Sequence, residues 1–252
     1  MIAERIHQAD TLRRLHHGSE PLLLPNVWDV ASARAVTGAG FPVVATSSHA
    51  IAASLGLPDA DVMAPELAFD VVARIAASVD VPVTADLEAG YQLPADELVE
   101  RLLRAGAVGC NLEDTDHHGR DVLVPLGRQA ARLRTVRQAS EAAGVPLVIN
   151  ARIDVFLREA GEPEARLSEA IRRGQAYRAA GADCLYPIGL SEPSAIRTFV
   201  REVGAPVNIR LHPDGPSRQA LAALGVARIS LVTGLFRRSI EAIERALDEL
   251  RA

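Results

Sequence analysis

The stretch EAAGVPLV, residues 141–148, decides the fold because variants of it recur along the chain. In each copy an Ala- and Arg-rich segment ends near a Gly, and a short apolar run begins within about three residues. Gly often stops a helix, and near-continuous apolar runs are typical of strands that are covered on both faces. The other copies are GAGFPVV (38–44), RAGAVGC (104–110), RAAGADCL (178–185), VGAPVN (203–208) and ALGVARIS (223–230). The sequence therefore predicts one helix-to-strand unit that is repeated.

Eight apolar runs qualify as strands, and helical segments separate them. The strand candidates are LLLPNV (22–27), PVVATS (42–47), PVTADL (82–87), VGCNLE (108–113), PLVINAR (146–152), CLYPI (184–188), PVNIRL (206–211) and RISLVT (228–233). The helical segments are 30–39, 65–78, 94–105, 127–143, 164–180, 193–203, 216–224 and 236–250. This pattern predicts an α/β fold, a single (β/α)8 TIM-type barrel over residues 1–252 with an extra N-terminal helix at 1–17. A doubly wound open sheet is the alternative, but no G-x-G-x-x-G follows the first strand.

Composition limits the classes of function. The net charge is −5 and no basic cluster stands out, so we expect no nucleic-acid partner. The apolar runs are strand-sized, so we expect no membrane partner. The N-terminus lacks an apolar signal-peptide core, which predicts a cytoplasmic protein. The two cysteines, Cys110 and Cys184, fall inside predicted strands, where they are expected to be core residues without a catalytic role.

Carboxylates stand at the ends of neighbouring predicted strands. Asp86 and Glu88 are two residues apart, so strand geometry would point both side chains the same way, and Glu113 ends the next strand. The carboxyl ends of barrel strands form the active face. Converging carboxylates repel one another unless a cation lies between them, and oxygen ligands suit Mg²⁺ or Mn²⁺. We therefore predict a metal site here. Asp114 and Asp154 each begin a loop, so we expect them to cap helices in solvent.

Arg152 ends an apolar strand, where an unpaired guanidinium would be costly. Its partner could be Glu113 on the neighbouring strand or a substrate carboxylate bound by two hydrogen bonds, and the two roles are compatible. We predict a catalytic role for both residues.

Polar residues at other strand ends are candidates for binding substrate. The stretch TSSH (46–49) could offer hydroxyls and backbone N–H groups to an anion, or it could be an ordinary polar turn. His49 could act as an acid or base, or be a solvated loop residue. Asp59 lies in the segment 48–64, which is long for a βα loop, and could reach the metal or lie in a surface turn. The predicted substrate-binding residues are Thr46, Ser47, Ser48, Asn150, Arg152 and Asn208.

Several motifs in this order resemble those of the isocitrate lyase/phosphoenolpyruvate mutase superfamily, from about Leu23 to Ile240. LPNVWDVASARAV (24–36) and AGFPVVATSS (39–48) resemble the family's opening strand, helix and second strand. SLGLPD (54–59) is similar to its loop that ends in Asp. DLEAGY (86–91) resembles its D-x-D/E-x-G-Y metal motif, GAVGCNLED (106–114) its G-x-x-G-x-x-x-E-D motif, and NARID (150–154) its A-R-x-[DE] motif.

The resemblance implies a barrel that binds Mg²⁺ and a small 2-oxo carboxylate or its enolate. It implies that Ser47, Ser48 and Arg152 hold the substrate carboxylate. The metal would be held, mostly through water, by Asp59, Asp86, Glu88 and Glu113. The eighth helix is often exchanged between subunits in this family. The resemblance also implies a homo-oligomer, a dimer or a tetramer.

The loop after the fourth strand, TDHHGRDVLVPLGR (115–128), departs from the family. Members that cleave isocitrate or methylisocitrate carry K-[KR]-C-G-H there, and this loop has neither Cys nor Lys. A P-K-x-N-like motif, which members with P–C chemistry carry, is missing as well. The departure argues against both groups of activities.

These observations predict a Mg²⁺-dependent carbon–carbon lyase acting on a small 2-oxo or 2-hydroxy dicarboxylate through a metal-stabilised enolate. The bond would break by decarboxylation or by a retro-aldol or retro-Claisen step, and the proton would come from water, His49, His117 or His118. One alternative is a phosphoenolpyruvate mutase or phosphonopyruvate hydrolase. A second is a sugar-phosphate barrel enzyme, although the paired-Gly phosphate cradle is absent. A third is a barrel that only binds a metabolite.

Overall fold

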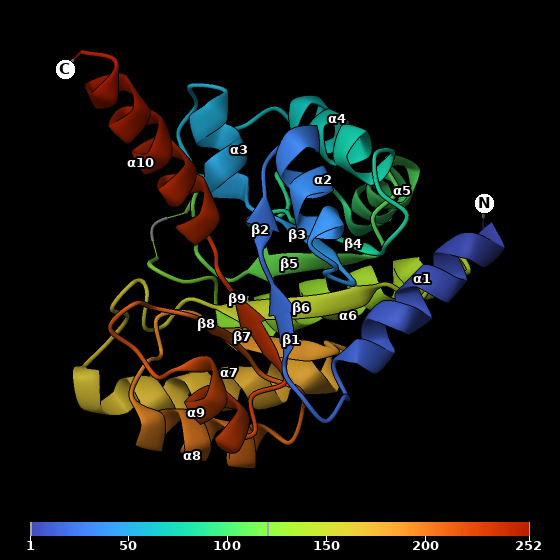
Figure 1. Cartoon of the computed structure of the whole chain (residues 1–252). Coiled ribbons are helices and arrows are strands. Elements are labelled where there is room, and N and C mark those ends of the chain that lie inside the picture. The colour runs from blue at the N-terminus through green and yellow to red at the C-terminus, as the bar shows by residue number, and fades with distance from the viewer. Residues whose placement is uncertain (1, 120, 252) are drawn as a thin grey trace.

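Parallel strands pair with one another in the order in which they follow along the chain (Figure 1). The computed structural model describes residues 2–119 and 121–251, so Met1, Arg120 and Ala252, at the two ends and in the predicted loop 115–128, lie outside the described residues. The strands are β1 (Leu22–Leu24), β2 (Asn26–Val27), β3 (Val44–Thr46), β4 (Val83–Asp86), β5 (Gly109–Glu113), β6 (Val148–Ile153), β7 (Cys184–Pro187), β8 (Asn208–Arg210) and β9 (Arg228–Ser230).

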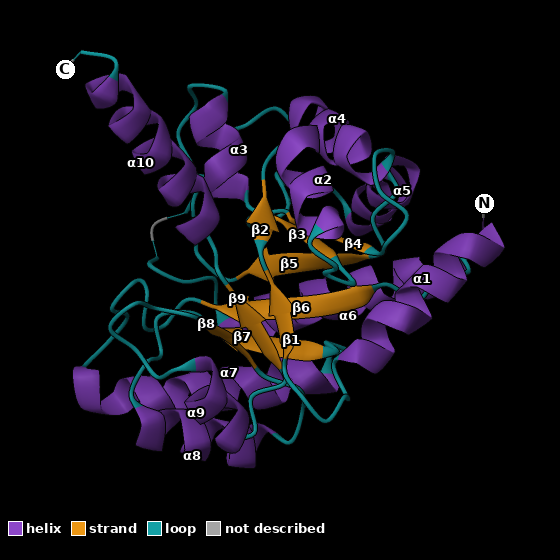
Figure 2. Ribbon diagram, viewed as in Figure 1, coloured by secondary structure: helices purple, strands orange, loops and turns teal. Residues whose placement is uncertain are grey.

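The helices are α1 (Ile2–Leu15), α2 (Val30–Gly38), α3 (Ser48–Ser54), α4 (Pro65–Ala76), α5 (Ala95–Ala105), α6 (Leu126–Ala142), α7 (Arg166–Ala179), α8 (Pro193–Val203), α9 (Arg218–Ala223) and α10 (Gly234–Glu249), with one 3-10 turn, η1 (Pro163–Ala165). Figure 2 shows helices around the strands, as expected for a barrel built from βα units.

The barrel closes through the first predicted strand. Pro25 divides that strand into β1 and β2, because proline cannot donate a ladder hydrogen bond. β2 begins the six-stranded sheet that runs to β7, while β1 pairs with β9, and β9 with β8. A bridge between Leu185 and Val207 joins β7 to the start of β8. The predicted eight-stranded (β/α)8 barrel is therefore confirmed, with β1 and β2 as one strand.

Side chains alternate along each strand between the helix layer and the barrel interior. Ile209 and Ile229, for example, pack in the main hydrophobic core, so their neighbours Asn208 and Arg228 face inward. At the amino ends of the strands, α1 buries Ala9 and Leu12 against apolar strand residues, which confirms the predicted extra N-terminal helix. The interior therefore holds apolar side chains next to α1, but it also holds the polar Asn208 and the charged Arg228 at the amino ends of β8 and β9.

His16, just beyond α1, is buried with its Nδ1 atom 2.8 Å from the carbonyl oxygen of Leu12. Its Nε2 atom has no hydrogen-bond partner among the described residues. Burial lowers the pKa of His16 to about 4, and the charge of Arg228 lowers it further, while nearby Asp183 opposes these effects. Below pH 6.5 the unfolded chain therefore binds a proton at His16 that the folded chain excludes.

Acidification is expected to destabilise the protein through this histidine. Because the pKa of His16 is depressed in the folded state, its contribution is fully present above pH 6.5 and is lost as the pH falls toward 4. Between about pH 7.5 and pH 4.5, His16→Gln should lose about 2 kcal/mol less unfolding free energy than the wild type, measured by urea denaturation. His7→Gln, which replaces an exposed histidine on α1, is the matched control. Equal losses in all three proteins would contradict the prediction.

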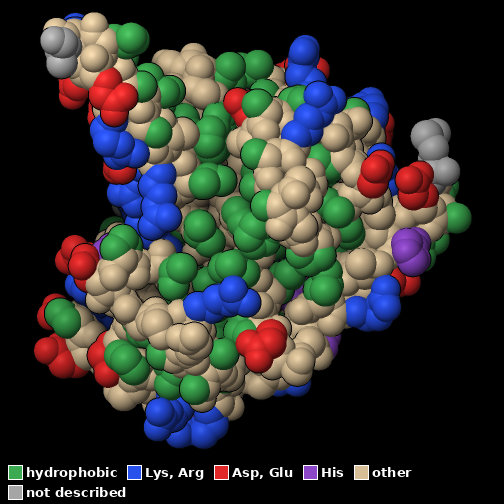
Figure 3. Space-filling view, viewed as in Figure 1, with side chains coloured by type: hydrophobic (Ala, Val, Ile, Leu, Met, Phe, Trp, Pro, Cys, Tyr) green, Lys and Arg blue, Asp and Glu red, His purple; other side chains and the backbone are tan. Residues whose placement is uncertain are grey.

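Helix α10 leaves the body of the barrel and buries none of its residues (Figure 1). At its base, Phe236 stacks edge-on against Trp28, with ring centroids 5.1 Å apart. Farther out, its exposed apolar side chains lie three or four residues apart, at Ile240, Ile243, Leu247 and Leu250. Figure 3 shows acidic and arginine side chains on the side of this helix that faces the viewer. α10 therefore carries an apolar stripe that this chain alone leaves uncovered.

A membrane span is not found among the helices of the described residues, none of which is both long and apolar enough.

Candidate active site

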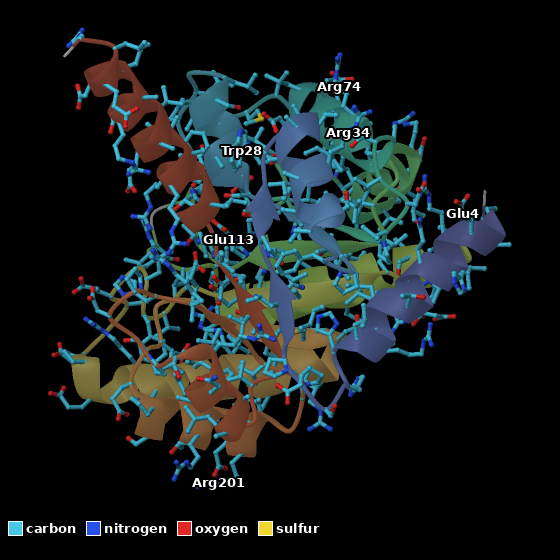
Figure 4. All side chains as sticks on the ribbon, in the orientation of Figure 1. Glu4, Trp28, Arg34, Arg74, Glu113 and Arg201 are labelled. Atoms are coloured by element: carbon cyan, nitrogen blue, oxygen red, sulfur yellow. The ribbon has the colours of Figure 1, made fainter. Side chains whose placement is uncertain are left out.

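Charged side chains from three neighbouring strands meet at the carboxyl end of the barrel. The strand register places Asp86 beside Asn111, and Glu113 beside Arg152. Figure 4 shows Glu113 at the end of β5, on the side of the barrel where α3 and α10 begin. The predicted convergence of Asp86, Glu113 and Arg152 at one rim is therefore present in the structure.

Arg152 is held by two carboxylates. Its Nε and Nη2 atoms donate to the two oxygens of Asp154 at 2.8 and 2.9 Å, and its Nη1 atom forms an ion pair with Glu113. The predicted pairing with Glu113 is confirmed. Burial opposes the charged form of Arg152, but Asp154 and Glu113 outweigh it and raise the pKa of Arg152 well above its ordinary value. Burial also raises the pKa of Glu113, and Arg152 acts against that rise.

The prediction that Asp114 and Asp154 cap helices in solvent is wrong, because both are fully buried. The backbone N–H of Asp154 donates to Asp114 at 2.8 Å. Asp114 also accepts hydrogen bonds from Tyr177 Oη at 2.7 Å and from Arg173 Nη1 at 2.9 Å. α7 therefore brings in the positive charge that allows Asp114 to be buried beneath the rim, while Arg152 neutralises Asp154.

Asp86 accepts hydrogen bonds from the start of α3 and from the neighbouring strand β5. The backbone N–H and the hydroxyl of Ser48 lie 3.2 and 3.0 Å from its Oδ2 atom, and Asn111 Nδ2 lies 3.3 Å from its Oδ1 atom. The backbone N–H of Asp86 donates to Thr46 Oγ1 at 2.9 Å. Ser47 caps α3 by accepting from Ala50. The first part of the predicted loop 48–64 is therefore the helix α3, which holds Asp86 in place.

Glu88 lies near Asp59, Asp86 and Glu113, which together with it are called the acid cluster, but not because of strand spacing. β4 ends at Asp86, and Glu88 lies beyond it in a left-handed turn with φ 51°. Its Oε2 atom accepts from the backbone N–H of Asp61, and its buried Oε1 atom has no partner among the described residues. Burial raises the pKa of Glu88 to about 8, and the charges of Asp59, Asp86 and Glu113 add to the rise. The negatively charged form of Glu88 is therefore disfavoured in this structure, and a cation bound nearby would stabilise it.

Asp61 was missed by the sequence reasoning, which considered only Asp59 in this segment. Asp61 is buried, and it accepts from the backbone N–H of Tyr91 and contacts His118 Nε2, both at 2.9 Å. It thereby ties the segment after α3 to the turn that carries Glu88. The signal was available in PDAD (58–61), where a second acid follows Asp59 by two residues.

The histidines near the mouth differ in their contacts. His117 Nε2 lies 2.5 Å from Glu113 Oε1, and this hydrogen bond raises the pKa of His117. His118 contacts Asp61, as described above. His49 instead pairs with Asp59 at 3.2 Å, and its side chain is 58% exposed. His117 and His118 therefore contact the buried acids Glu113 and Asp61, whereas the exposed His49 contacts Asp59.

Two predicted substrate-binding amides lie beneath the rim. Asn150 is fully buried and donates to Asn111 Oδ1 at 2.8 Å. Asn208 is fully buried as well, and neither polar atom of its side chain has a partner among the described residues. Their contact with substrate stays a prediction.

Both cysteines are buried, and burial raises the pKa of Cys110 and of Cys184 to about 12. Their thiols therefore stay protonated near neutral pH.

A hydrated Mg²⁺ or Mn²⁺ ion fits this donor set. Within residues 2–119 and 121–251, no three His, Cys, Asp or Glu side chains lie close enough to enclose an ion by themselves. Mg²⁺ usually keeps several waters and takes only one or two carboxylates directly. The unpartnered oxygen of Glu88, amid three other acids, is the observation that favours a cation here. Asp86, Glu88, Glu113 and Asp59 are the residues that would hold it, mostly through water.

Comparisons with known proteins agree on the kind of barrel. A family model described as phosphoenolpyruvate phosphomutase matches residues 12–251. A crystal structure from Burkholderia cenocepacia J2315, provisionally described as a phosphonomutase, is 38% identical, covers 96% of this chain and 99% of its own, and superposes with a TM-score of 0.90. The structure of 2,3-dimethylmalate lyase, a PEP mutase/isocitrate lyase superfamily member, is 26% identical and has a TM-score of 0.86. The match covers 97% of this chain and 87% of the lyase chain. Oxaloacetate decarboxylase from Rhodopseudomonas palustris (strain BisB5) is 29% identical, and the match covers 95% of this chain and 83% of the decarboxylase.

Proposed function

Because the chain belongs to the isocitrate lyase/phosphoenolpyruvate mutase superfamily, we propose that it is a Mg²⁺-dependent carbon–carbon lyase. Its substrate would be a small 2-oxo or 2-hydroxy dicarboxylate. Among its relatives, the lyase and the decarboxylase named above have activities that break a carbon–carbon bond. The proposal extends that chemistry to this chain.

One observation carries the proposal. Ser48 donates to Asp86 while Arg152 pairs with Glu113, so groups that bind anions lie directly beside acids that favour a cation. A 2-oxo acid needs both, since its carboxylate is an anion and its carbonyl oxygen gains negative charge as the bond at C3 breaks.

The chain's own residues would orient the substrate and supply the proton. Bound Mg²⁺ would add the positive charge that stabilises the enolate. Ser47, Ser48 and Arg152 would hold the substrate carboxylate, and the buried pair of Arg152 with Asp154 would fix the guanidinium in place. After the bond breaks, the enolate carbon takes a proton from water or from His117 Nε2, which the contact with Glu113 favours over exposed His49.

A phosphomutase is the second candidate, since the description of the Burkholderia cenocepacia structure favours it. The sequence argues against it. All 27 residues that are lysine or arginine are arginine, so no segment of this sequence can supply the lysine of the P-K-x-N-like loop. We therefore rank the lyase first.

A panel of substrates tests the proposal. Release of pyruvate or CO₂ should be followed with Mg²⁺ for oxaloacetate, methylisocitrate, citramalate and phosphonopyruvate, with a chelator as the control. We expect that at least one of oxaloacetate, methylisocitrate and citramalate is turned over and that the chelator abolishes this turnover. Turnover of phosphonopyruvate alone, detected as pyruvate release for a hydrolase or as phosphoenolpyruvate formation for a phosphomutase, would favour P–C chemistry. If no substrate of the panel gave product but the protein still bound oxalate, the result would favour a barrel that only binds a metabolite.

We also propose that two copies of the chain associate through the apolar stripe of α10. A stripe of four exposed apolar residues on one face of a helix is typical of a surface that another helix covers. The wild type should be a dimer or tetramer by light scattering, and Ile243→Glu with Leu247→Glu should lower its mass to that of one chain. Arg245→Glu, which changes charge without touching the stripe, is the control. A monomeric wild type, or a double variant with unchanged mass, would contradict the proposal.

A further inference from the structure

Arg210 stands on the far side of the barrel mouth from the acid cluster. It is the last residue of β8, and it faces inward like Asn208, because Ile209 between them packs in the outer core. When β1 and β2 are counted as one strand, β4 is the third strand of the barrel and β8 the seventh. The third and seventh strands of a closed eight-stranded barrel lie opposite each other. Arg210 therefore faces Asp86 across the mouth.

The guanidinium of Arg210 lacks the partners that Arg152 has. Arg152 is neutralised by Glu113 and Asp154. Arg210 forms no ion pair with another described residue, and its buried Nε atom has no hydrogen-bond partner. A positive charge that is partly removed from water and unpaired is a ready site for an anion.

Two hydroxyl groups lie beside Arg210 on the same rim. Ser230 is its register partner on β9, and the hydroxyl of Ser230 lies 3.3 Å from that of Tyr186 on β7. Burial raises the pKa of Tyr186 to about 12, although the charges of Arg152 and Arg210 act against the rise. Tyr186 is therefore a neutral donor that lies within the field of both arginines.

We propose that Arg210, together with Tyr186, binds the second carboxylate of a dicarboxylate substrate. The first carboxylate and the adjacent carbonyl would lie at the acid cluster, and the substrate would extend across the mouth to the guanidinium. A substrate without the second carboxylate would leave Arg210 unpaired, so this residue would select dicarboxylates over monocarboxylates. The inference rests on the proposed function and names the residue that selects its substrate class.

Calorimetry with two probes, in the presence of Mg²⁺, tests the inference. Oxalate joins its two carboxylates directly and is too short to span the mouth, whereas 3,3-difluorooxaloacetate carries a second carboxylate farther away. Arg210→Met should weaken binding of 3,3-difluorooxaloacetate on the order of 10- to 100-fold and change oxalate affinity much less. Arg210→Lys should recover part of the loss. Arg197→Met, an exposed arginine on α8, is the control for lost charge.

The possible failures are distinguishable. If Arg210→Met weakened both probes equally, or neither, the inference would be overturned while the proposed function stood. If Arg210→Met failed to fold, unchanged discrimination between the probes in Arg210→Lys and in Tyr186→Phe would overturn it. If the wild type bound neither probe in a Mg²⁺-dependent way, the proposed function would fail, and the inference with it.

Discussion

Replacing Arg152 with lysine is expected to lower kcat/KM about 100-fold, although the positive charge is kept. The guanidinium uses a planar fork to hold Asp154 with two hydrogen bonds, while its third nitrogen pairs with Glu113. An ammonium group has no such fork and can satisfy only part of this arrangement. Glu113 and the substrate carboxylate would both lose their fixed partner. Steady-state kinetics with the substrate identified in the panel measures the effect.

Arg152→Met should abolish measurable turnover and also lower the free energy of unfolding by about 3–5 kcal/mol, because two buried carboxylates lose their partner. The lysine variant separates the two effects, since it should fold with a smaller loss. Arg201→Lys, on the surface of α8, is the control and should retain full activity. If Arg152→Lys retained wild-type kcat/KM, neither the fork nor its contact with substrate would matter for the reaction.

The barrel and most of the charged rim could be predicted from the sequence, because both depend on local patterns. Apolar runs that follow Gly mark strands wherever they occur, and residues at strand ends must share one face of a closed barrel. That reasoning was enough to bring Asp86, Glu113 and Arg152 together. The pairing of Arg152 with Glu113 followed from the cost of an unpaired charge at a strand end.

The remaining errors involve contacts that sequence spacing does not encode. Asp114 and Asp154 looked like solvated loop residues because the partner of Asp114 is Arg173, on a helix far along the chain. Strand spacing predicted that Glu88 points toward the site, but the reason was wrong, since Glu88 adopts a left-handed turn outside the strand. The buried carboxylate of Asp61 contacts the backbone N–H of Tyr91 and the side chain of His118, both distant from it in the sequence. Such residues require the tertiary structure.

Replacing Arg173 with methionine is expected to lower the free energy of unfolding by about 3–5 kcal/mol. Arg173 is buried, and its Nη1 atom donates to Asp114, to the carbonyl of Val124 and to Tyr177 Oη at 2.9, 3.0 and 3.0 Å. Without it Asp114 would remain buried with one neutral hydroxyl and one backbone N–H as donors. Urea denaturation measures the loss. Arg172→Met, the neighbouring residue on the exposed face of α7, should cost less than about 0.5 kcal/mol.

The pH dependence identifies Asp114 as the cause of this loss. Burial already raises the pKa of Asp114, and Arg173 acts against that rise, so the variant should raise it further. A raised carboxyl pKa means that the folded state binds more protons than the unfolded state, so stability decreases as the pH rises through that range. The deficit of Arg173→Met should therefore be smaller near pH 5 than near pH 8, and adding Asp114→Asn should remove most of this difference. A deficit that is independent of pH would instead mean that Arg173 stabilises the fold by packing.

Arg173→Met should also lower kcat/KM, because Asp114 holds the backbone of Asp154, and Asp154 holds Arg152. The double variant with Asp114→Asn should restore kcat/KM in part.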